Sequence, residues 1–173
     1  MIRAFSMTLI GLFLVAGILS SCKKKEAEIP PDTTKTMAPA FSLVSLAGDT
    51  VSLDQLNGKV VVLFFLGYSC HYCIESAPEV QSMVANMYAS NSNVVVLGLD
   101  VWDGGTAQVE SFKTETGVTF PLLLNAGITG TAYGTTNDRL VVVDQMGYIR
   151  LTGQQAAYKD IDAVKGTVDM LLQ

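Results

Sequence analysis

Two cysteines separated by two residues, Cys70 and Cys73, are the side chains whose type and spacing most directly suggest chemistry. They follow an unbroken apolar run at residues 60–66 and a glycine at position 67. After this glycine the apolar residues recur at helical spacing; they are Cys70, Cys73, Ala77, Val80, Val84 and Met87. The pattern predicts a buried strand, a tight turn and an amphipathic helix that carries both cysteines in its first turn.

A Cys-x-x-Cys pair at the start of a helix is typical of a reactive dithiol. The free N–H groups and the helix dipole place about half a positive charge there, which favours thiolate over thiol. The pKa of a cysteine, ordinarily about 8.5, falls to between about 3.5 and 7.5 in such motifs. We therefore expect Cys70 to be the more exposed, attacking thiolate and Cys73 to be the resolving thiol. His71, the only histidine, would favour the Cys70 thiolate further if it is protonated.

A structural disulfide and half of a zinc site are the two simpler interpretations of the same pair. A disulfide across so short a loop removes little chain entropy and therefore stabilises little. One histidine without a second cysteine pair cannot complete four zinc ligands. The spacing and the strand-to-helix context thus favour redox chemistry, and we expect neither a metal nor a bound cofactor.

The composition is that of one globular domain. The chain has 173 residues, of which 49% are hydrophobic, and a formal net charge of −5. This length is sufficient for one domain with a sizeable core. The negative charge gives no support to a nucleic-acid partner.

The N-terminal segment has the features of an export signal. Residues 1–21 combine a short positive start at Arg3 with an apolar stretch that is short for a membrane span. The sequence Leu19-Ser20-Ser21-Cys22 resembles the lipobox of bacterial lipoproteins, so Cys22 is the expected lipid attachment site. A signal anchor with an unrelated cysteine is the alternative. Residues 22–37 would then be a lipid-anchored linker, since they contain Pro30-Pro31 and no periodicity.

This segment predicts a location in the bacterial cell envelope, with the domain outside the cytoplasm and acyl chains on a membrane. Lys23 stands where an aspartate would indicate retention in the inner membrane in some bacteria. The outer membrane is therefore preferred.

Residues 38–173 predict an α/β domain with a central mixed sheet flanked by helices. The expected strands share apolar or alternating patterns; they lie in a hairpin within 41–53 and at 60–66, 93–99, 122–124, 140–144 and 148–151. The expected helices follow turn or capping residues; they are a turn at 54–56, the cysteine helix with a kink at Pro78, residues 106–116 capped by Thr106, a short helix near 130–133, and a last helix from about residue 159.

Several of these motifs together resemble one family. They are Ala38-Pro39-Ala40-Phe41, Cys70-His71-Tyr72-Cys73 after the apolar strand, Pro78-Glu79, and the hairpin at residues 144–149. The domain resembles the TlpA/ResA-like, redoxin-type (AhpC/TSA-type) branch of thioredoxin-fold proteins, and residues 104–124 match the helix-strand segment inserted in this branch. The resemblance implies a membrane-anchored thiol-disulfide oxidoreductase outside the cytoplasm. Its partners would be protein thiols or disulfides and an upstream electron donor.

Some positions depart from the family pattern. Ser69 stands where a tryptophan usually precedes the first cysteine, so the hydrophobic shield over the site should be missing. Phe64 replaces a buried aspartate that relays protons to the inner cysteine, and Ser76 replaces a frequent glutamate. Glu75 lies about 200° around the helix from Cys73 and should point away. No general base can therefore be assigned.

The largest departure is Asp138, at the place of the family's cis-proline that faces the cysteines. An aspartate there would repel the Cys70 thiolate and raise its pKa. Alternatively, the loop at residues 134–139 is built differently and Arg139 reaches the site as a thiolate stabiliser. A surface role for both residues is equally open.

Three aromatic residues lie close to the motif in sequence or in the expected fold. Tyr68 and Tyr72 flank it and offer a stacking surface for a partner. Trp102 follows the second central strand at the edge of the sheet where α/β proteins bind ligands. For all three, a packing role is the alternative interpretation.

Two other functions remain open. The first is a thiol peroxidase, because Arg139 lies close to the position of the peroxiredoxin arginine; however, Gly67 stands where those enzymes need a threonine. The second is non-enzymatic, a copper-binding or copper-delivery protein that uses both thiolates and His71, since soft thiolates suit Cu(I).

Overall fold

The computed structural model of the chain describes residues 36–173. The predictions for the signal peptide, for Cys22 and for the linker up to residue 35 lie outside the described residues. None of the helices in the described range combines the length and the apolarity needed to cross a membrane.

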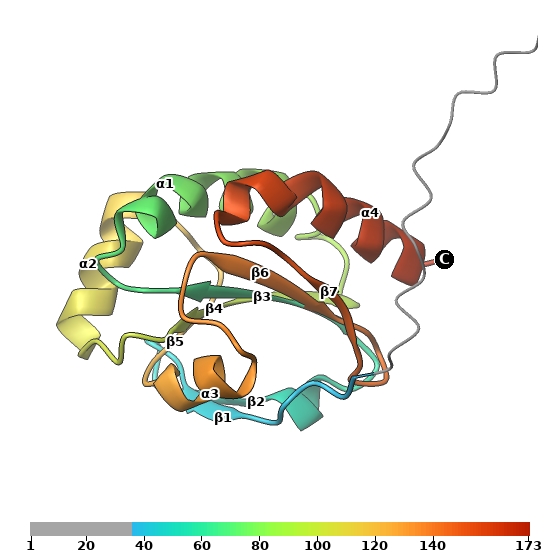
Figure 1. Cartoon of the computed structure of the whole chain (residues 1–173), viewed down its shortest axis with the longest axis horizontal. Coiled ribbons are helices and arrows are strands. Elements are labelled where there is room, and N and C mark those ends of the chain that lie inside the picture. The colour runs from blue at the N-terminus through green and yellow to red at the C-terminus, as the bar shows by residue number, and fades with distance from the viewer. Residues whose placement is uncertain (1–35) are drawn as a thin grey trace, which may run out of the picture. The chain divides into compact units, whose positions relative to one another are not determined.

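A five-stranded mixed sheet forms the centre of the domain (Figure 1). Its order is β5-β4-β3-β6-β7, and its strands are β3 (Val60–Leu66), β4 (Val94–Asp100), β5 (Leu122–Leu123), β6 (Arg139–Val143) and β7 (Ile149–Thr152). β3, β4 and β5 are parallel, whereas β6 is antiparallel to β3 and to β7. The predicted mixed sheet with an antiparallel terminal hairpin is confirmed.

β3 is the central strand, and all seven of its residues are buried. Alternate side chains point to opposite faces of a strand. Phe64 accordingly packs in the core half that contains both cysteines, while Phe65 packs in the other half. A continuous apolar run, rather than an alternating one, is what a strand covered on both faces requires.

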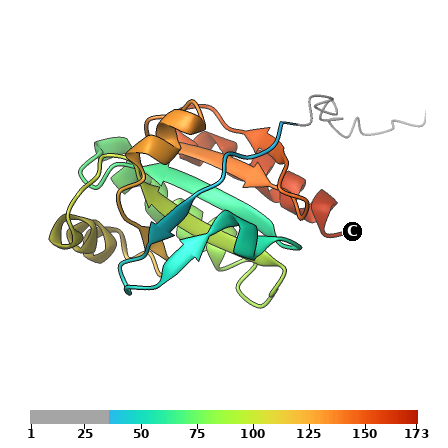
Figure 2. The same ribbon diagram turned by 90° about the horizontal axis from the view of Figure 1, so that it is seen from below.

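Helices α1 (His71–Val80), α2 (Thr106–Thr116) and α4 (Ile161–Leu171) cover one face of the sheet (Figure 1). The hairpin β1 (Ser42–Val44) and β2 (Thr50–Ser52) lies on the other face with α3 (Gly127–Ala132), as Figure 2 shows from below. α2 and β5 are the helix and strand predicted for the inserted segment. The thioredoxin-like arrangement is thus present, with a core on each side of the sheet.

The stripe of apolar residues on the cysteine helix follows the prediction as far as Val84 and then changes phase. α1 includes Pro78 and ends at Val80, and a π-helical turn follows at Gln81–Ala85. Such a turn contains one extra residue. The prediction that Met87 is buried was therefore wrong: Met87 is 50% exposed, and Tyr88 is buried one position later.

Other boundaries differ from the prediction by a few residues. α2 has the predicted ends, with Gly117 in a left-handed conformation just after it. Its N-cap, however, is Gly105 rather than Thr106, and the Gly105 N–H donates to the Gln108 side chain at 2.8 Å. α3 begins earlier than expected, and a 3-10 turn at Ala157–Asp160 precedes α4.

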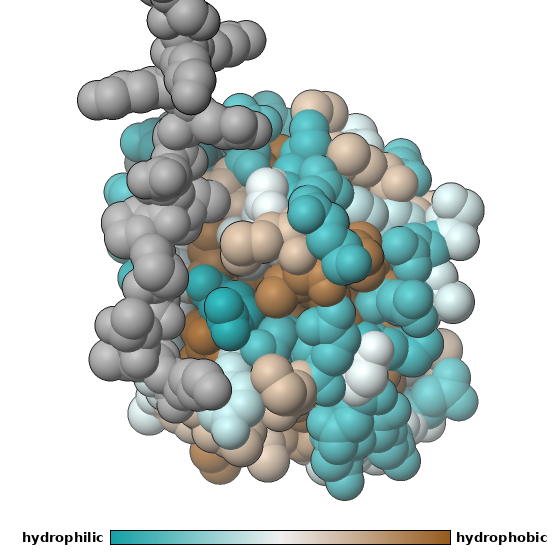
Figure 3. Space-filling view, turned by 90° about the vertical axis from the view of Figure 1, so that its right-hand side faces the viewer, coloured by the Kyte–Doolittle hydropathy of each residue, from teal (hydrophilic) through white to brown (hydrophobic). Residues whose placement is uncertain are grey.

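The end of the domain that carries the β6–β7 turn lies away from the cysteines, because Cys70 follows the opposite end of β3. Figure 3 views this end and shows apolar surface broken up by hydrophilic residues. Met37 and Met146 are both exposed there, and the Ala38 N–H donates to the Gly147 carbonyl beside them. This surface therefore plays no direct part in cysteine chemistry.

Candidate active site

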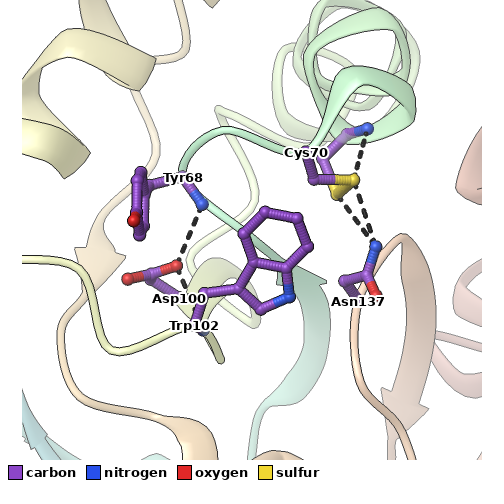
Figure 4. Close-up of a disulfide and its surroundings, with 6 residues drawn as sticks. Tyr68, Cys70, Asp100, Trp102 and Asn137 are labelled. Carbon is purple, nitrogen blue, oxygen red and sulfur yellow. Dashed lines mark hydrogen bonds between the residues drawn. A yellow bond between two sulfur atoms is a disulfide. The ribbon is translucent and has the colours of Figure 1, made fainter.

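Cys70 is the N-cap of α1, as its position after the Gly67 turn predicts. Its Sγ accepts a hydrogen bond of 3.2 Å from the backbone N–H of Cys73, and the two cysteines form a disulfide (Figure 4). An acceptor at this point satisfies one of the free N–H groups of the first helical turn. The same N–H and the helix dipole would stabilise a thiolate at Cys70 after reduction.

Cys70 is the more exposed of the two cysteines, as predicted, but both are buried. Cys70 is 4% exposed and Cys73 is fully buried, so the predicted order of the two residues holds. Both sulfurs lie in the core half between the sheet and α1, because they continue the apolar stripe of the helix. An incoming thiolate therefore has a narrow approach to Cys70.

Asn137 is the residue that sequence reasoning missed. Its side-chain Nδ2 donates to Cys70 Sγ at 3.1 Å and lies 3.9 Å from Cys73 Sγ, as the dashed lines of Figure 4 show. The residue comes from the loop before β6 and lies 67 positions from Cys70 in the sequence. The only signal was that Asn137 immediately precedes the position at which the family carries its cis-proline.

Asp138 follows Asn137 in the loop before β6. It has a left-handed backbone with φ 49°, which aspartate tolerates better than most residues. Its carbonyl accepts a 3.0 Å hydrogen bond from Ala156, which is itself left-handed with φ 85°. The Asp138 side chain is buried and makes no hydrogen bond to either sulfur in the described part of the chain. The effect of Asp138 on the thiolate therefore stays a prediction, as does the alternative that the loop is built differently from the family pattern.

Arg139 begins β6, where it pairs with Phe65. Cross-strand partners share a face, and Phe65 lies in the core half opposite the cysteines. Arg139 instead influences Asp160. Burial raises the pKa of Asp160, whereas the hydrogen bond from the Gln154 N–H and the charge of Arg139 lower it and Asp138 raises it. This register gives no support to a contact between Arg139 and the sulfurs, and its role as a thiolate stabiliser stays a prediction.

His71 and Tyr72 lie between the cysteines on the exposed side of α1. His71 Nε2 is 3.3 Å from Glu75 Oε1, one turn along the helix, and both side chains are largely exposed. Glu75 thus points away from the sulfurs, as predicted. Tyr72 is 63% exposed, and its ring lies beside the His71 ring with centroids 5.6 Å apart and an interplanar angle of 57°. Both side chains therefore lie on the exposed surface of the helix that begins at the disulfide.

A surface pocket of roughly 360 Å³ lies beside these residues. It is lined by Tyr72, Asn137, Asp138, Gln155, Ala156, Tyr158 and Lys159. Because Asn137 contacts Cys70 and also lines the pocket, the pocket leads toward the disulfide. This arrangement would admit a side chain or an extended segment of another protein.

Asp100, at the end of β4, joins the cysteine turn to the following loop. Its carboxylate accepts hydrogen bonds from the N–H groups of Tyr68 at 3.0 Å, Gly104 at 2.6 Å and Trp102 at 3.4 Å. The side chain is 1% exposed. Burial raises the pKa of Asp100 above its ordinary value, although the three hydrogen bonds oppose the rise.

Ser69 replaces a tryptophan of the family, but another aromatic side chain, that of Trp102, packs on the turn before Cys70. A Cβ atom at Gly67 would overlap the Trp102 ring, so this glycine allows the indole to pack directly on the turn. The Trp102 and Tyr68 rings meet edge to face with centroids 6.1 Å apart. In Figure 4 the indole of Trp102 lies between Asp100 and the disulfide at Cys70. Trp102 is 45% exposed and thus covers the turn before Cys70 while part of its ring stays open to solvent.

The raised pKa of Asp100 predicts how its contribution to stability depends on pH. The folded chain takes up this proton at higher pH than the unfolded chain, so acidification favours the folded state. We expect wild type to gain stability relative to Asp100→Asn as pH falls from about 7 through the folded pKa of Asp100. Urea unfolding of both proteins over this range measures the difference. A wild-type advantage that grows with rising pH would contradict the assignment.

Neither Phe64 nor Ser76 can act as a general base for the dithiol. Phe64 is fully buried in the apolar core. Ser76 is also fully buried, and its hydroxyl has no hydrogen-bond partner in the described range. Within residues 36–173 there is also no group of three or more His, Cys, Asp or Glu side chains that could hold a metal.

Comparison with known proteins identifies the family. Residues 34–152 match the AhpC/TSA family. A thioredoxin-like protein, YneN of Bacillus subtilis, is 30% identical over 118 residues, which are 65% of this chain and 66% of that protein. The thiol-disulfide oxidoreductase ResA of Bacillus thuringiensis is 30% identical over 90 residues, 52% of this chain and 50% of that protein. The chain thus spans between half and two thirds of the length of these relatives.

Solved structures show the same fold. A proposed protein disulfide isomerase from Bacteroides thetaiotaomicron has a TM-score of 0.72 at 26% identity, with 80% of this chain and 89% of that chain covered. A proposed thiol:disulfide interchange protein DsbE from Chlorobium tepidum has a TM-score of 0.70 at 23% identity, with 80% and 97% covered. With its disulfide at the start of α1 and its thioredoxin-like sheet, the chain belongs to the AhpC/TSA family.

Proposed function

We propose that this protein is a thiol-disulfide oxidoreductase that exchanges electrons with disulfides of other proteins through Cys70 and Cys73. The observation that carries the proposal is the position of Cys70 Sγ at the N-terminus of α1, bonded to Cys73 and to the Cys73 N–H. The likeness to ResA, whose name describes this activity, supports the same conclusion.

The exchange needs two displacements at sulfur. The Cys70 thiolate attacks one sulfur of the substrate disulfide, forms a mixed disulfide and releases the other substrate sulfur as a thiolate, which takes up a proton. The Cys73 thiol then gives its proton to solvent and attacks Cys70 Sγ as a thiolate. This step forms the Cys70–Cys73 disulfide and releases the second substrate thiolate. Two electrons pass from the dithiol to the substrate, and an upstream donor returns the pair to the reduced state.

The proposed setting is the bacterial cell envelope, with the domain anchored to a membrane by lipid and located outside the cytoplasm. The lipobox-like sequence that ends at Cys22 supports lipid attachment, and residues 22–37 would tether the domain to the outer membrane. Incorporation of labelled palmitate into wild type but not into Cys22→Ser tests this part. A labelled Cys22→Ser protein would contradict it.

Neither alternative function gains support from the site. A peroxidatic cysteine needs a nearby hydroxyl or charged donor, whereas the residue three before Cys70 is Gly67, packed under Trp102. For copper binding, His71 points toward Glu75 rather than toward the sulfurs. Thiol-disulfide exchange through Cys70 and Cys73 remains the reaction that the geometry supports best.

Reduction of insulin by dithiothreitol tests the proposed function. We expect the wild-type protein to shorten the lag before the insulin chains precipitate, in proportion to its concentration. Hydrogen peroxide consumption, measured in parallel, should stay at the level of dithiothreitol alone. A protein that consumes peroxide but leaves the insulin lag unchanged would overturn the proposal in favour of a peroxidase.

A further inference from the structure

We propose that Asn137 is a catalytic residue whose side-chain amide stabilises negative charge on the two cysteine sulfurs in turn. The inference rests on the proposed dithiol exchange and adds a specific donor to it. Its basis is that the Asn137 amide reaches both sulfurs, 3.1 Å from Cys70 and 3.9 Å from Cys73.

The chemistry of the amide fits this role. A side-chain amide has two N–H hydrogens on one nitrogen, so it can serve two acceptors without gaining or losing a proton. In the described part of the chain, the hydrogen bonds to these sulfurs come from Asn137 and from the Cys73 backbone N–H. Asn137 is therefore the one side chain there that donates to the reacting atoms.

The loop holds the amide in place. Asp138, the next residue, is left-handed, and its carbonyl is bonded to the Ala156 N–H at 3.0 Å. Asn137 itself is half-buried at the edge of the pocket, between the disulfide and the solvent. The amide therefore approaches the sulfurs from the side on which a substrate would arrive.

The charge moves during the exchange, and Asn137 can follow it. In the reduced protein the charge lies on Cys70, which receives the Asn137 hydrogen bond and the Cys73 N–H. In the mixed disulfide Cys70 Sγ is neutral, and the charge must form on Cys73 before it attacks. The amide then needs to close only the 3.9 Å separation to Cys73 Sγ. Phe64 and Ser76, at the positions of the family acids, make no hydrogen bond to either sulfur.

Two substitutions at Asn137 distinguish the effect of its N–H donor from the effect of its size and shape. Asn137→Leu keeps similar volume but has no donor, and we expect the pKa of Cys70 in the reduced protein to rise by about one unit. The equilibrium with glutathione should shift about tenfold toward the protein disulfide, about 30 mV more reducing. Asn137→Asp keeps the shape and adds negative charge, so both changes should be larger in the same direction.

Asn57→Asp is the matched control, because it makes the same chemical change on the exposed surface at the opposite end of β3. It should leave both quantities unchanged. The measurements are the pH dependence of Cys70 alkylation in the reduced protein and the glutathione equilibrium, with far-ultraviolet circular dichroism to verify the fold. If Asn137→Asp and Asn137→Leu both titrate and equilibrate like wild type, the inference is overturned.

These measurements use only small thiols, so they separate the inference from the proposed function. If the wild-type protein fails to reduce insulin but both Asn137 variants show a raised Cys70 pKa, the result supports the inference and contradicts the proposed activity. If the wild-type protein reduces insulin but the Cys70 pKa is unchanged in both Asn137 variants, the result supports the proposed activity and contradicts the inference.

Discussion

Replacement of Cys70 by serine is expected to reduce insulin turnover to the rate of dithiothreitol alone. A serine hydroxyl at the start of α1 stays protonated near neutral pH and cannot attack a disulfide as a thiolate does. The variant should fold, because the side chains are similar in size and Cys70 Sγ already acts as an N-cap acceptor, a role that serine performs well. Turbidity of insulin with dithiothreitol measures the loss.

The matched variant Cys73→Ser should behave differently. Cys70 can still attack, but no second thiol displaces the substrate, so a mixed disulfide should accumulate that is visible on a non-reducing gel and by mass spectrometry. The fully buried position of Cys73 makes it a poor first nucleophile. A mixed disulfide trapped by Cys70→Ser instead of Cys73→Ser would show that the two roles are reversed.

Removal of the Asp100 carboxylate has the largest expected effect on stability. Asp100→Ala leaves the backbone N–H groups of Tyr68, Trp102 and Gly104 without their acceptor. Because the cost of a buried unpaired donor is about 1–3 kcal/mol, we expect the free energy of unfolding to fall by about 3 kcal/mol. The turn before Cys70 should also loosen, which changes the fluorescence of Trp102, the only tryptophan in the sequence.

Asp103→Ala is the control for this prediction. Asp103 is exposed and accepts one 2.8 Å hydrogen bond, from the Gly127 N–H, so its loss should cost no more than about 1 kcal/mol. Urea unfolding of the three proteins, followed by circular dichroism and by fluorescence, gives both values. Equal losses in the two variants would mean that Asp100 is not the link between the turn and the loop.

The main elements could be predicted from the sequence because their patterns are local. The apolar run of β3 and the helical spacing after Cys70 are visible within about 25 residues, and they place the cysteines at a helix start whatever surrounds them. The mixed sheet was predicted from the alternation of strands and helices and from the terminal hairpin. The change of phase at Met87 could not be predicted, because a π-helical turn has no clear sequence signature.

The surroundings of the disulfide depend on contacts between distant segments. Asn137 and Trp102 come from two different loops. The only signals in the sequence were the place of Asn137 before the expected cis-proline position and the place of Trp102 after a central strand. Their positions follow from features that exist only in the folded chain, namely the left-handed backbone of Asp138 and the three bonds to Asp100. The sequence indicated the two cysteines, whereas the side chains that surround them could be placed only from the fold.

Transfer of electrons from this dithiol to another protein is the central claim, and one stoichiometric reaction tests it. The fully reduced protein is mixed with an excess of a disulfide-containing protein without any small thiol, quenched with an alkylating agent and weighed by mass spectrometry. One substrate disulfide should be opened for each Cys70–Cys73 disulfide that forms. If the quench alkylates both cysteines of the protein, which shows that they are still reduced, and every substrate disulfide stays intact, the account is contradicted.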